Sequence, residues 1–225
     1  MLNAIFDNGR GPGTLEEQRA RMVEEQLRSR GIRDIRVLTA MGKVPREEFI
    51  AREDLGDAYG DHPLPIGAGQ TVSQPYIVAV MVEALDLRPS DRVLEVGTGT
   101  GYEAAIFAEL AAEVWTVERH QELASKAQDI LTRLGYTNVH VVHGDGSLGL
   151  PEHAPFDKIL VAAGAPRIPE SLVAQLVDGG KLVLPVGTRD EQQVQIVRKE
   201  GKETYVTFHD LCRFVPLVGA EGWQQ

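Results

Sequence analysis

Residues 93–102 read VLEVGTGTGY, and this stretch decides which fold we expect of the chain. A short, mostly apolar run of the kind found in buried strands leads into three glycines at alternate positions, and the helix-forming run AAI follows at 104–106. Glycine permits positive φ and leaves room for a ligand to approach the backbone. In open α/β sheets, ligands bind in the crevice beyond the carboxyl ends of the strands. The stretch therefore predicts an α/β sheet with a ligand at this loop.

Downstream of the glycine loop, β-rich runs alternate with amphipathic helical runs. The predicted strands are 92–96, 114–118, 139–143, 158–162 and 181–186, and the predicted helices include 120–134 and 170–177. This alternation predicts a mostly parallel, doubly wound sheet with helices on both faces. Two final runs, 194–199 and 205–208 continuing towards 214, are separated by Gly201 without room for a helix. They predict a C-terminal antiparallel hairpin at the sheet edge.

The chain upstream of the loop is predicted to be an N-terminal helical extension. Residues 1–13 are rich in glycine and show little periodicity, so we expect a flexible leader. Thr14 and Glu17 have the spacing of a capping box, and the helix that they begin should end at Gly31. Further helices are expected at 34–41 and 75–87, with a brief helical piece at 44–49 and a loop at 62–69. We divide the chain into the leader 1–13, the helical and loop segment 14–88, and the α/β core with its hairpin 89–225, all packed as one compact domain.

The composition excludes several classes of protein. The 225 residues carry 23 Lys plus Arg against 33 Asp plus Glu, and a net charge of −10 argues against binding to nucleic acid. Neither a signal peptide nor an apolar stretch long enough to span a membrane is present, so we expect a cytoplasmic protein without membrane contact. Cys212 is the only cysteine, which fits a reducing compartment. The six histidines lack ligand spacing, so no metal is expected, and the composition is compatible with a monomer.

The glycine loop fits an adenosyl cofactor better than a dinucleotide. The dinucleotide fingerprint needs a third glycine at position 102, where this chain has Tyr102. The pattern Glu95-x-Gly97-x-Gly99-x-Gly101 instead resembles the first motif of the Rossmann-like S-adenosylmethionine methyltransferases, in which the loop passes beside the methionine portion of the cofactor. The stretch LVDGGKLV at 176–183 resembles a late motif of the same enzymes.

Acidic residues follow the next two predicted strands. Glu118 lies 21 residues beyond Gly97, where a carboxylate can accept hydrogen bonds from both ribose hydroxyls, although an acid at a strand end is also a common cap. Asp145, within HGDG at 143–146, could accept from the exocyclic amine of adenine or simply form an Asp-Gly turn. Together with the glycine loop, these elements indicate an adenosyl cofactor.

Two segments outside the cofactor motifs narrow the substrate. The stretch GQTVSQPY at 69–76 closely resembles the signature that protein-L-isoaspartate methyltransferases carry before their first cofactor motif. The stretch RFVPLVG at 213–219 resembles the closing segment of that family, whose main chain helps to hold the substrate. With these motifs in order, the resemblance runs from about Thr14 to Trp223.

The resemblance implies methyl transfer from S-adenosyl-L-methionine to the α-carboxylate of L-isoaspartyl residues in proteins and peptides, with S-adenosyl-L-homocysteine as product and repair through a succinimide. It assigns cofactor binding to Glu95, Gly97, Thr98, Gly99, Thr100, Gly101, Tyr102, Glu118, Arg119, Asp145 and Gly146. It places Ser73 in the active-site position and the peptide against Thr71, Val72, Pro216, Leu217 and Val218. Ser73 is also a good N-cap for the following helix, and both roles can hold together.

The implied chemistry needs few titratable groups. A carboxylate is already ionised at neutral pH and a sulfonium methyl is already activated, so the enzyme must supply in-line placement and exclude water. Three other functions remain open. A methyltransferase for a small molecule would share the glycine loop, a catalytically silent adenosyl-binding module would share the whole cofactor half, and a nucleotide-dependent oxidoreductase ranks last because of Tyr102.

Overall fold

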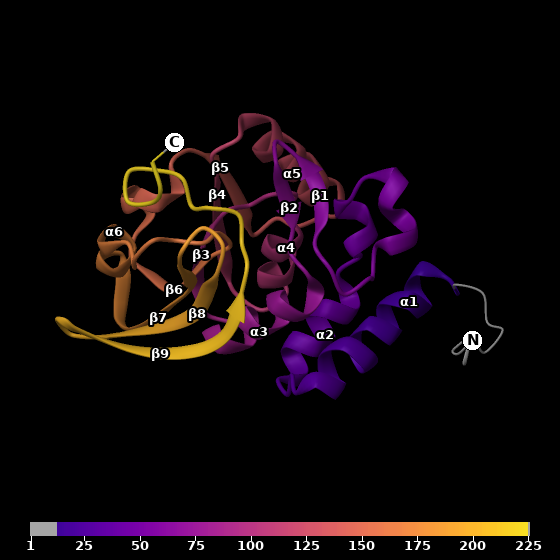
Figure 1. Cartoon of the computed structure of the whole chain (residues 1–225), viewed down its shortest axis with the longest axis horizontal. Coiled ribbons are helices and arrows are strands. Elements are labelled where there is room, and N and C mark those ends of the chain that lie inside the picture. The colour runs from indigo at the N-terminus through magenta and orange to yellow at the C-terminus, as the bar shows by residue number, and fades with distance from the viewer. Residues whose placement is uncertain (1–12, 225) are drawn as a thin grey trace.

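A single mixed sheet forms the centre of the molecule (Figure 1). The structure, a computed structural model, describes residues 13–224, so the predicted leader lies outside the described residues except for Gly13. The sheet has the order β5-β4-β3-β6-β7-β8-β9. Its strands are β3 (Arg92–Val96), β4 (Glu113–Glu118), β5 (Val139–His143), β6 (Phe156–Val161), β7 (Leu176–Gly187), β8 (Gln192–Glu200) and β9 (Glu203–Cys212).

The chain changes direction across the sheet next to β3. From β3 it runs outward through β4 to β5 and then returns to pair β6 with the other side of β3, all in parallel. The crevice of an open α/β sheet lies at such a switch point. The glycine loop leaves β3 there, and the predicted parallel sheet is confirmed. The antiparallel pairing of β7, β8 and β9 confirms the C-terminal hairpin.

Each face of the sheet buries its own cluster of apolar side chains. Val93 belongs to one cluster and its neighbour Leu94 to the other, because successive strand residues point to opposite faces. The first cluster includes side chains of α3 (Pro75–Leu85), α4 (Tyr102–Ala108) and α5 (Gln121–Arg133), and the second includes α6 (Glu170–Ala174). The prediction of helices on both faces is confirmed.

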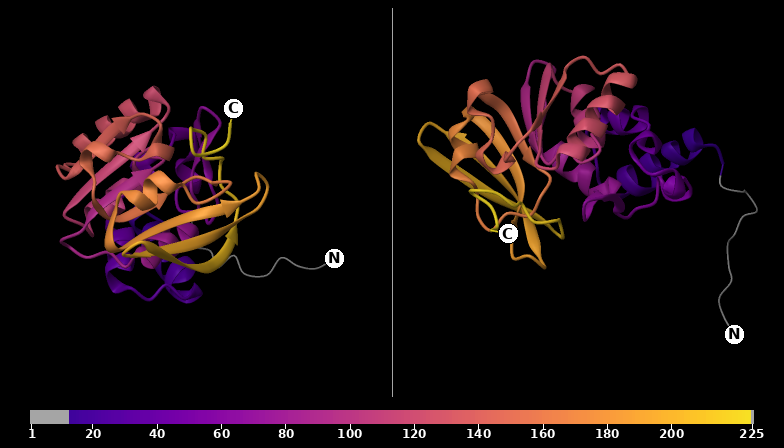
Figure 2. Two further views of the ribbon diagram at one scale, coloured as in Figure 1. Left: turned by 90° about the vertical axis from the view of Figure 1, so that its left-hand side faces the viewer. Right: turned by 90° about the horizontal axis from the view of Figure 1, so that it is seen from above.

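The N-terminal helices join the first of these clusters. Helix α1 (Leu15–Arg21) begins with the predicted capping box at Thr14 and continues through a π-helical turn (Met22–Leu27) and a 3₁₀ turn (Arg28–Arg30). Helix α2 (Ile35–Lys43) is capped by Asp34. Short 3₁₀ segments follow at Arg46–Phe49 and Arg52–Asp57. Figure 2 shows these helices at the opposite end of the molecule from the β8–β9 hairpin.

One predicted element is wrong, and another is shorter than predicted. The stretch 62–69, expected to be a loop, contains β1 (Leu64–Gly67), which pairs antiparallel with β2 (Gln70–Val72). The prolines of this stretch suggest a loop, but the short strand pairs with its neighbour across a turn of positive-φ residues, Gly67 to Gly69. The helix predicted over 170–177 ends at Ala174, because Leu176 pairs with Phe156 and begins β7.

Among residues 13–224, no helix has the length and apolar character needed to cross a membrane.

Gln175 lies just before β7 and binds the segment that follows β5. Removal of its side chain should destabilise the fold. Its buried side chain, 7% exposed, accepts from the Leu150 amide at 2.8 Å and donates to the Leu148 carbonyl at 2.8 Å. Gln175→Ala leaves both backbone groups without these partners, so we expect the free energy of unfolding to fall by about 2–4 kcal/mol in urea denaturation. Gln128→Ala, on the exposed face of α5, is the matched control. Equal stability of the two variants would contradict this role of Gln175.

Candidate functional site

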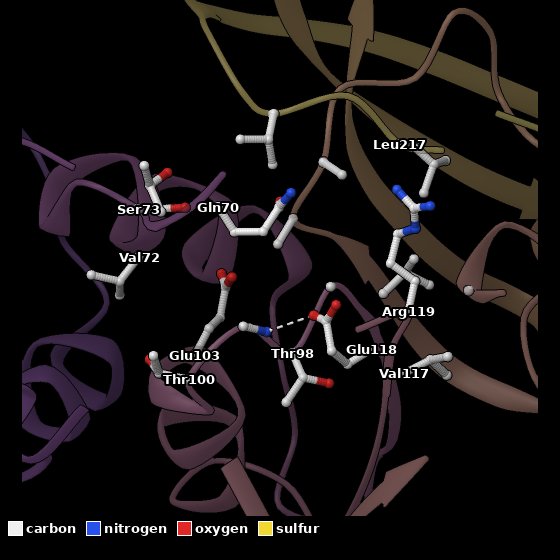
Figure 3. A pocket seen from close by; sticks show the side chains of 18 of the residues that line it. Gln70, Val72, Ser73, Thr98, Thr100, Glu103, Val117, Glu118, Arg119 and Leu217 are labelled. Carbon is white, nitrogen blue, oxygen red and sulfur yellow. Dashed lines mark hydrogen bonds between the residues drawn. The ribbon is translucent and has the colours of Figure 1, made fainter. Parts of the chain in front are cut away.

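A cleft opens at the carboxyl ends of β3, β4 and β6 (Figure 3). It encloses about 780 Å³ of space, part of which is open to solvent. Four parts of the chain supply most of its walls: the glycine loop with the start of α4, the end of β4, the segment 70–73 and the C-terminal segment 215–218.

The glycine loop lies against both the sheet and the N-terminal hairpin. The Gly97 amide donates to the Val117 carbonyl at 2.8 Å, which joins the loop to β4. Gly99 has φ +54°, and a Cβ there would lie 3.2 Å from the Ile66 side chain of the β1–β2 hairpin. Gly101 has φ +90°, and a Cβ would lie 3.1 Å from the Leu131 side chain of α5. A side chain at either position would strain the backbone and crowd the loop.

Glu118 fixes the loop from the end of β4. Its carboxylate accepts from the Gly99 amide at 3.0 Å, the bond drawn in Figure 3, and from the His120 amide at 2.9 Å. A carboxylate has about four acceptor sites, so two backbone bonds leave capacity for a ligand diol. Arg119, the next residue, also lines the cleft.

Two more carboxylates lie near the loop, and both are buried. Glu95 is fully buried in β3 and accepts from the Thr116 hydroxyl. Burial, together with the nearby charges of Glu103 and Glu118, raises its pKa well above the usual value, against the lowering effect of Thr116. Glu103, in the first turn of α4, lines the cleft, and burial raises its pKa to about 8. At neutral pH the Glu103 carboxyl is therefore mainly protonated.

The segment that contains Ser73 is held from behind by a buried arginine. Arg46 is 0% exposed and donates to the Ser73 carbonyl at 2.8 Å and to the Ala58 carbonyl at 2.9 Å. Its guanidinium lies 4.8 Å from the centre of the Tyr102 ring, which lines the cleft. The N-cap role predicted for Ser73 is wrong: Gln74 is the N-cap residue of α3, without a side-chain capping bond. The Ser73 side chain points into the cleft (Figure 3).

The C-terminal segment is fastened beside β6 by backbone pairing. The Gly164 amide donates to the Val215 carbonyl at 2.8 Å, and the Leu217 amide donates to the Gly164 carbonyl at 2.8 Å. Asp145 adds an anchor beyond this pair, because its carboxylate accepts from the Ala220 amide at 2.8 Å and from the Ser147 hydroxyl at 2.7 Å. These contacts set Pro216, Leu217 and Val218 against the cleft.

Known proteins that resemble this chain identify its family. The family model of protein-L-isoaspartate(D-aspartate) O-methyltransferase matches residues 17–222, nearly the whole chain. The chain belongs to this family. A protein-L-isoaspartate O-methyltransferase of Koribacter versatilis is 57% identical over 205 residues, which cover 91% of this chain and 92% of the relative. A protein-L-isoaspartate O-methyltransferase of Methanoculleus marisnigri is 53% identical over 208 residues, which cover 92% of this chain and 94% of the relative.

Solved structures agree with the family assignment. A protein-L-isoaspartate O-methyltransferase with 31% identity superposes with a TM-score of 0.82 and covers 91% of this chain and 67% of its own. A Plasmodium falciparum structure, described as this enzyme in complex with S-adenosyl-L-homocysteine, has 26% identity and a TM-score of 0.76, covering 88% and 96%. Similarity over nearly the whole chain confirms the Rossmann-like methyltransferase fold.

Most of the predicted site residues meet in the cleft. The predicted residues that line it are Ser73, Thr71, Val72, Pro216, Leu217, Val218, Gly97, Thr98, Gly99, Thr100, Tyr102, Glu118, Arg119 and Gly146. Three predicted cofactor residues do not line it. Glu95 lies buried in β3, Gly101 packs against α5, and Asp145 turns its carboxylate to the C-terminal segment. The contact between Asp145 and adenine stays a prediction.

Two polar residues of the cleft, Gln70 and Glu103, were not predicted from the sequence. Gln70 is part of the quoted segment 69–76 and could have been included on that ground. Glu103 is the one acidic residue of α4, whose other residues are apolar or aromatic, and such an acid is a recognisable signal. Within residues 13–224, no group of three or more His, Cys, Asp or Glu side chains could hold a metal ion.

Arg46 is predicted to position the Ser73 segment. Arg46→Met removes the donors to the Ser73 and Ala58 carbonyls, so we expect the free energy of unfolding to fall by about 2–4 kcal/mol. At a temperature where the variant is folded, the KM for a peptide substrate should rise more than the Kd for cofactor. Arg52→Met, at an exposed position of the neighbouring 3₁₀ segment, is the control. Unchanged stability and peptide KM would show that Arg46 does not support this segment.

Asp145 is predicted to stabilise the C-terminal segment in a pH-dependent way. Burial opposes its ionisation, but hydrogen bonds from Ala220 and Ser147 outweigh burial and hold its pKa below the usual value. We expect Asp145→Asn to lower the free energy of unfolding by about 1–2 kcal/mol at pH 7, and exchange of the Ala220 amide to become faster.

The pH dependence follows from the lowered pKa. The contribution of Asp145 is complete above the unfolded pKa of about 3.9 and disappears as pH falls through the lower folded value. In urea denaturation, Asp145→Asn should differ less from the native protein near pH 3 than at pH 7, and Asp129→Asn, at an exposed position of α5, is the control. A difference of the same size at both pH values would be inconsistent with this role.

Proposed function

We propose that this protein transfers a methyl group from S-adenosyl-L-methionine to the α-carboxylate of L-isoaspartyl residues in damaged proteins and peptides. One observation carries the proposal beyond the family assignment. The cleft at the glycine loop adjoins a broader surface groove, and the two share Ser73, Thr71 and Pro216. A small-molecule pocket and a peptide-sized groove thus meet at the residue expected to orient the acceptor.

The residues of the cleft fit an adenosyl cofactor. When bound, S-adenosyl-L-methionine supplies a methyl group on a positively charged sulfonium. Glu118, already fixed by backbone amides, keeps acceptor capacity for both ribose hydroxyls. Gly146 lines the cleft, and a Cβ there would lie 2.6 Å from the Val96 side chain, so a residue larger than glycine would disturb this part of the wall. Gly97, Thr98, Gly99 and Thr100 would hold the methionine portion along the loop, and Tyr102 and Arg119 border the cleft.

Ser73 is the residue that we assign to the acceptor carboxylate. Within residues 13–224 its hydroxyl makes no hydrogen bond, whereas its carbonyl is fixed by Arg46. The hydroxyl is therefore available to an anion that enters from the groove. Thr71, Val72 and the 216–218 segment flank the same junction and would contact the peptide, largely through main chain, which suits substrates with varied flanking sequences.

The role of the protein in the reaction is placement. The acceptor carboxylate is ionised at neutral pH, so no side chain has to remove a proton. Ser73 and the neighbouring amides orient the acceptor oxygen towards the cofactor end of the cleft. The C-terminal segment and the 70–73 segment cover the junction from two sides. This cover reduces the amount of water that can solvate the acceptor carboxylate and the sulfonium.

The remaining features of the proposal concern the chain as a whole. Side chains from both 14–88 and 89–225 share one apolar cluster, which supports one compact domain. The single cysteine supports a cytoplasmic location, and the net charge of −10 supports protein rather than nucleic-acid substrates. A monomer suffices for the proposed chemistry, because one chain supplies both the cleft and the groove.

The proposal is tested with methyl-labelled cofactor and two matched peptides, one with isoaspartate and one with normal aspartate. Base-labile methyl ester should form on the isoaspartyl peptide alone. Ser73→Ala should lower kcat/KM for that peptide by about tenfold or more, because the acceptor loses a charge-assisted hydrogen bond, with little change in cofactor Kd. Label on neither peptide, despite measured cofactor binding, would instead favour a methyltransferase for a small molecule.

A further inference from the structure

Glu103 is a buried acid in the cleft for which methyl transfer to a carboxylate gives no obvious use. It lies in the first turn of α4, is 8% exposed, and its Oε1 atom has no hydrogen-bond partner. Figure 3 shows its carboxyl group projecting into the cleft towards the side that carries Gln70 and Ser73. A polar side chain buried without a partner is costly, so a compensating role is expected.

The charged groups around Glu103 do not explain why a carboxyl group is buried there. Glu95 of β3 is the acidic group that interacts with it, and burial is the cause of the raised pKa of Glu103. Tyr102, on the same helix, is neutral. Arg46 lies behind the Tyr102 ring, and no ion pair within residues 13–224 joins a cation to Glu103. Among residues 13–224 no cation is paired with Glu103, so the cation of a ligand can take that place.

The position of Glu103 identifies the kind of cation. Glu118, at the other end of the glycine loop, is the acceptor for ribose hydroxyls, so the side of Glu103 and Ser73 is the methionine end of the cleft. The methionine portion carries an α-ammonium with three N–H donors, which suits a buried carboxylate. Resting on the proposed function above, we propose that Glu103 is the counter-charge and hydrogen-bond acceptor for the α-ammonium of the cofactor.

This assignment couples cofactor binding to a proton. Burial raises the pKa of Glu103 to about 8, so at pH 7 its carboxyl is mainly protonated in the free protein. The approaching ammonium favours the ionised form, and the carboxyl proton passes to solvent as the cofactor binds. Glu103→Gln resembles the protonated acid in shape, so this variant should keep the fold of the free protein while losing the charge.

Isothermal titration calorimetry tests the assignment with S-adenosyl-L-homocysteine, its deaminated analogue and S-adenosyl-L-methionine. Glu103→Gln should weaken both amino-bearing ligands about tenfold and leave the deaminated analogue unchanged. Glu122→Gln, at an exposed position of α5, should match the native protein with all three. Equal weakening of the deaminated analogue, or weakening of the sulfonium ligand alone, would overturn the ammonium assignment.

A proton count gives a second readout. Titrations at pH 7 in buffers with different ionisation enthalpies should show that the native protein releases close to one proton more than Glu103→Gln on binding S-adenosyl-L-homocysteine. The same proton count in both proteins would contradict the inference. Failure of the proposed function looks different: the native protein would bind none of the three adenosyl ligands, or it would bind them and leave the isoaspartyl peptide unmethylated.

Discussion

The attachment of the glycine loop to strand β4 is the constraint on which the rest of the site depends. The Gly97 amide reaches the Val117 carbonyl at 2.8 Å, and the Gly99 amide reaches the Glu118 carboxylate at 3.0 Å. A loop fixed in this way at the switch point keeps the crevice between β4 and β6 open to a ligand. The same carboxylate that fixes the loop also faces the cleft, so loop geometry and ligand recognition depend on one residue.

The other walls of the cleft come from distant parts of the sequence, and polar groups hold each of them. Arg46 fixes the Ser73 segment through its carbonyl, and Gly164 and Asp145 fix the C-terminal segment through backbone groups. The bonds of Arg46 are strongly orienting because breaking one leaves its buried guanidinium with fewer partners. For a reaction that needs no general base, rigid placement of two walls around one junction is the contribution that the protein can make.

The sequence predicted the sheet well because strands buried on both faces appear as apolar runs, as at 92–96, and because the glycine loop has few structural alternatives. Pairing between short segments is harder to predict, so the strands at 64–67 and 70–72 were missed. The orientation of a side chain is harder still. Asp145 follows a strand as expected, yet it turns to Ala220, and this depends on where the distant C-terminal segment lies. The burial of Glu103 likewise depends on which face of α4 meets the cleft.

The central claim is that the adenosyl cleft and the peptide groove meet at Ser73. A crystal structure with S-adenosyl-L-homocysteine and an isoaspartyl peptide bound together tests it most directly. The account predicts the ribose hydroxyls on Glu118 and the α-carboxylate beside Ser73, with one carboxylate oxygen directed at the sulfur. An adenosyl ligand outside this cleft, or a peptide whose carboxylate lies away from Ser73, would contradict it.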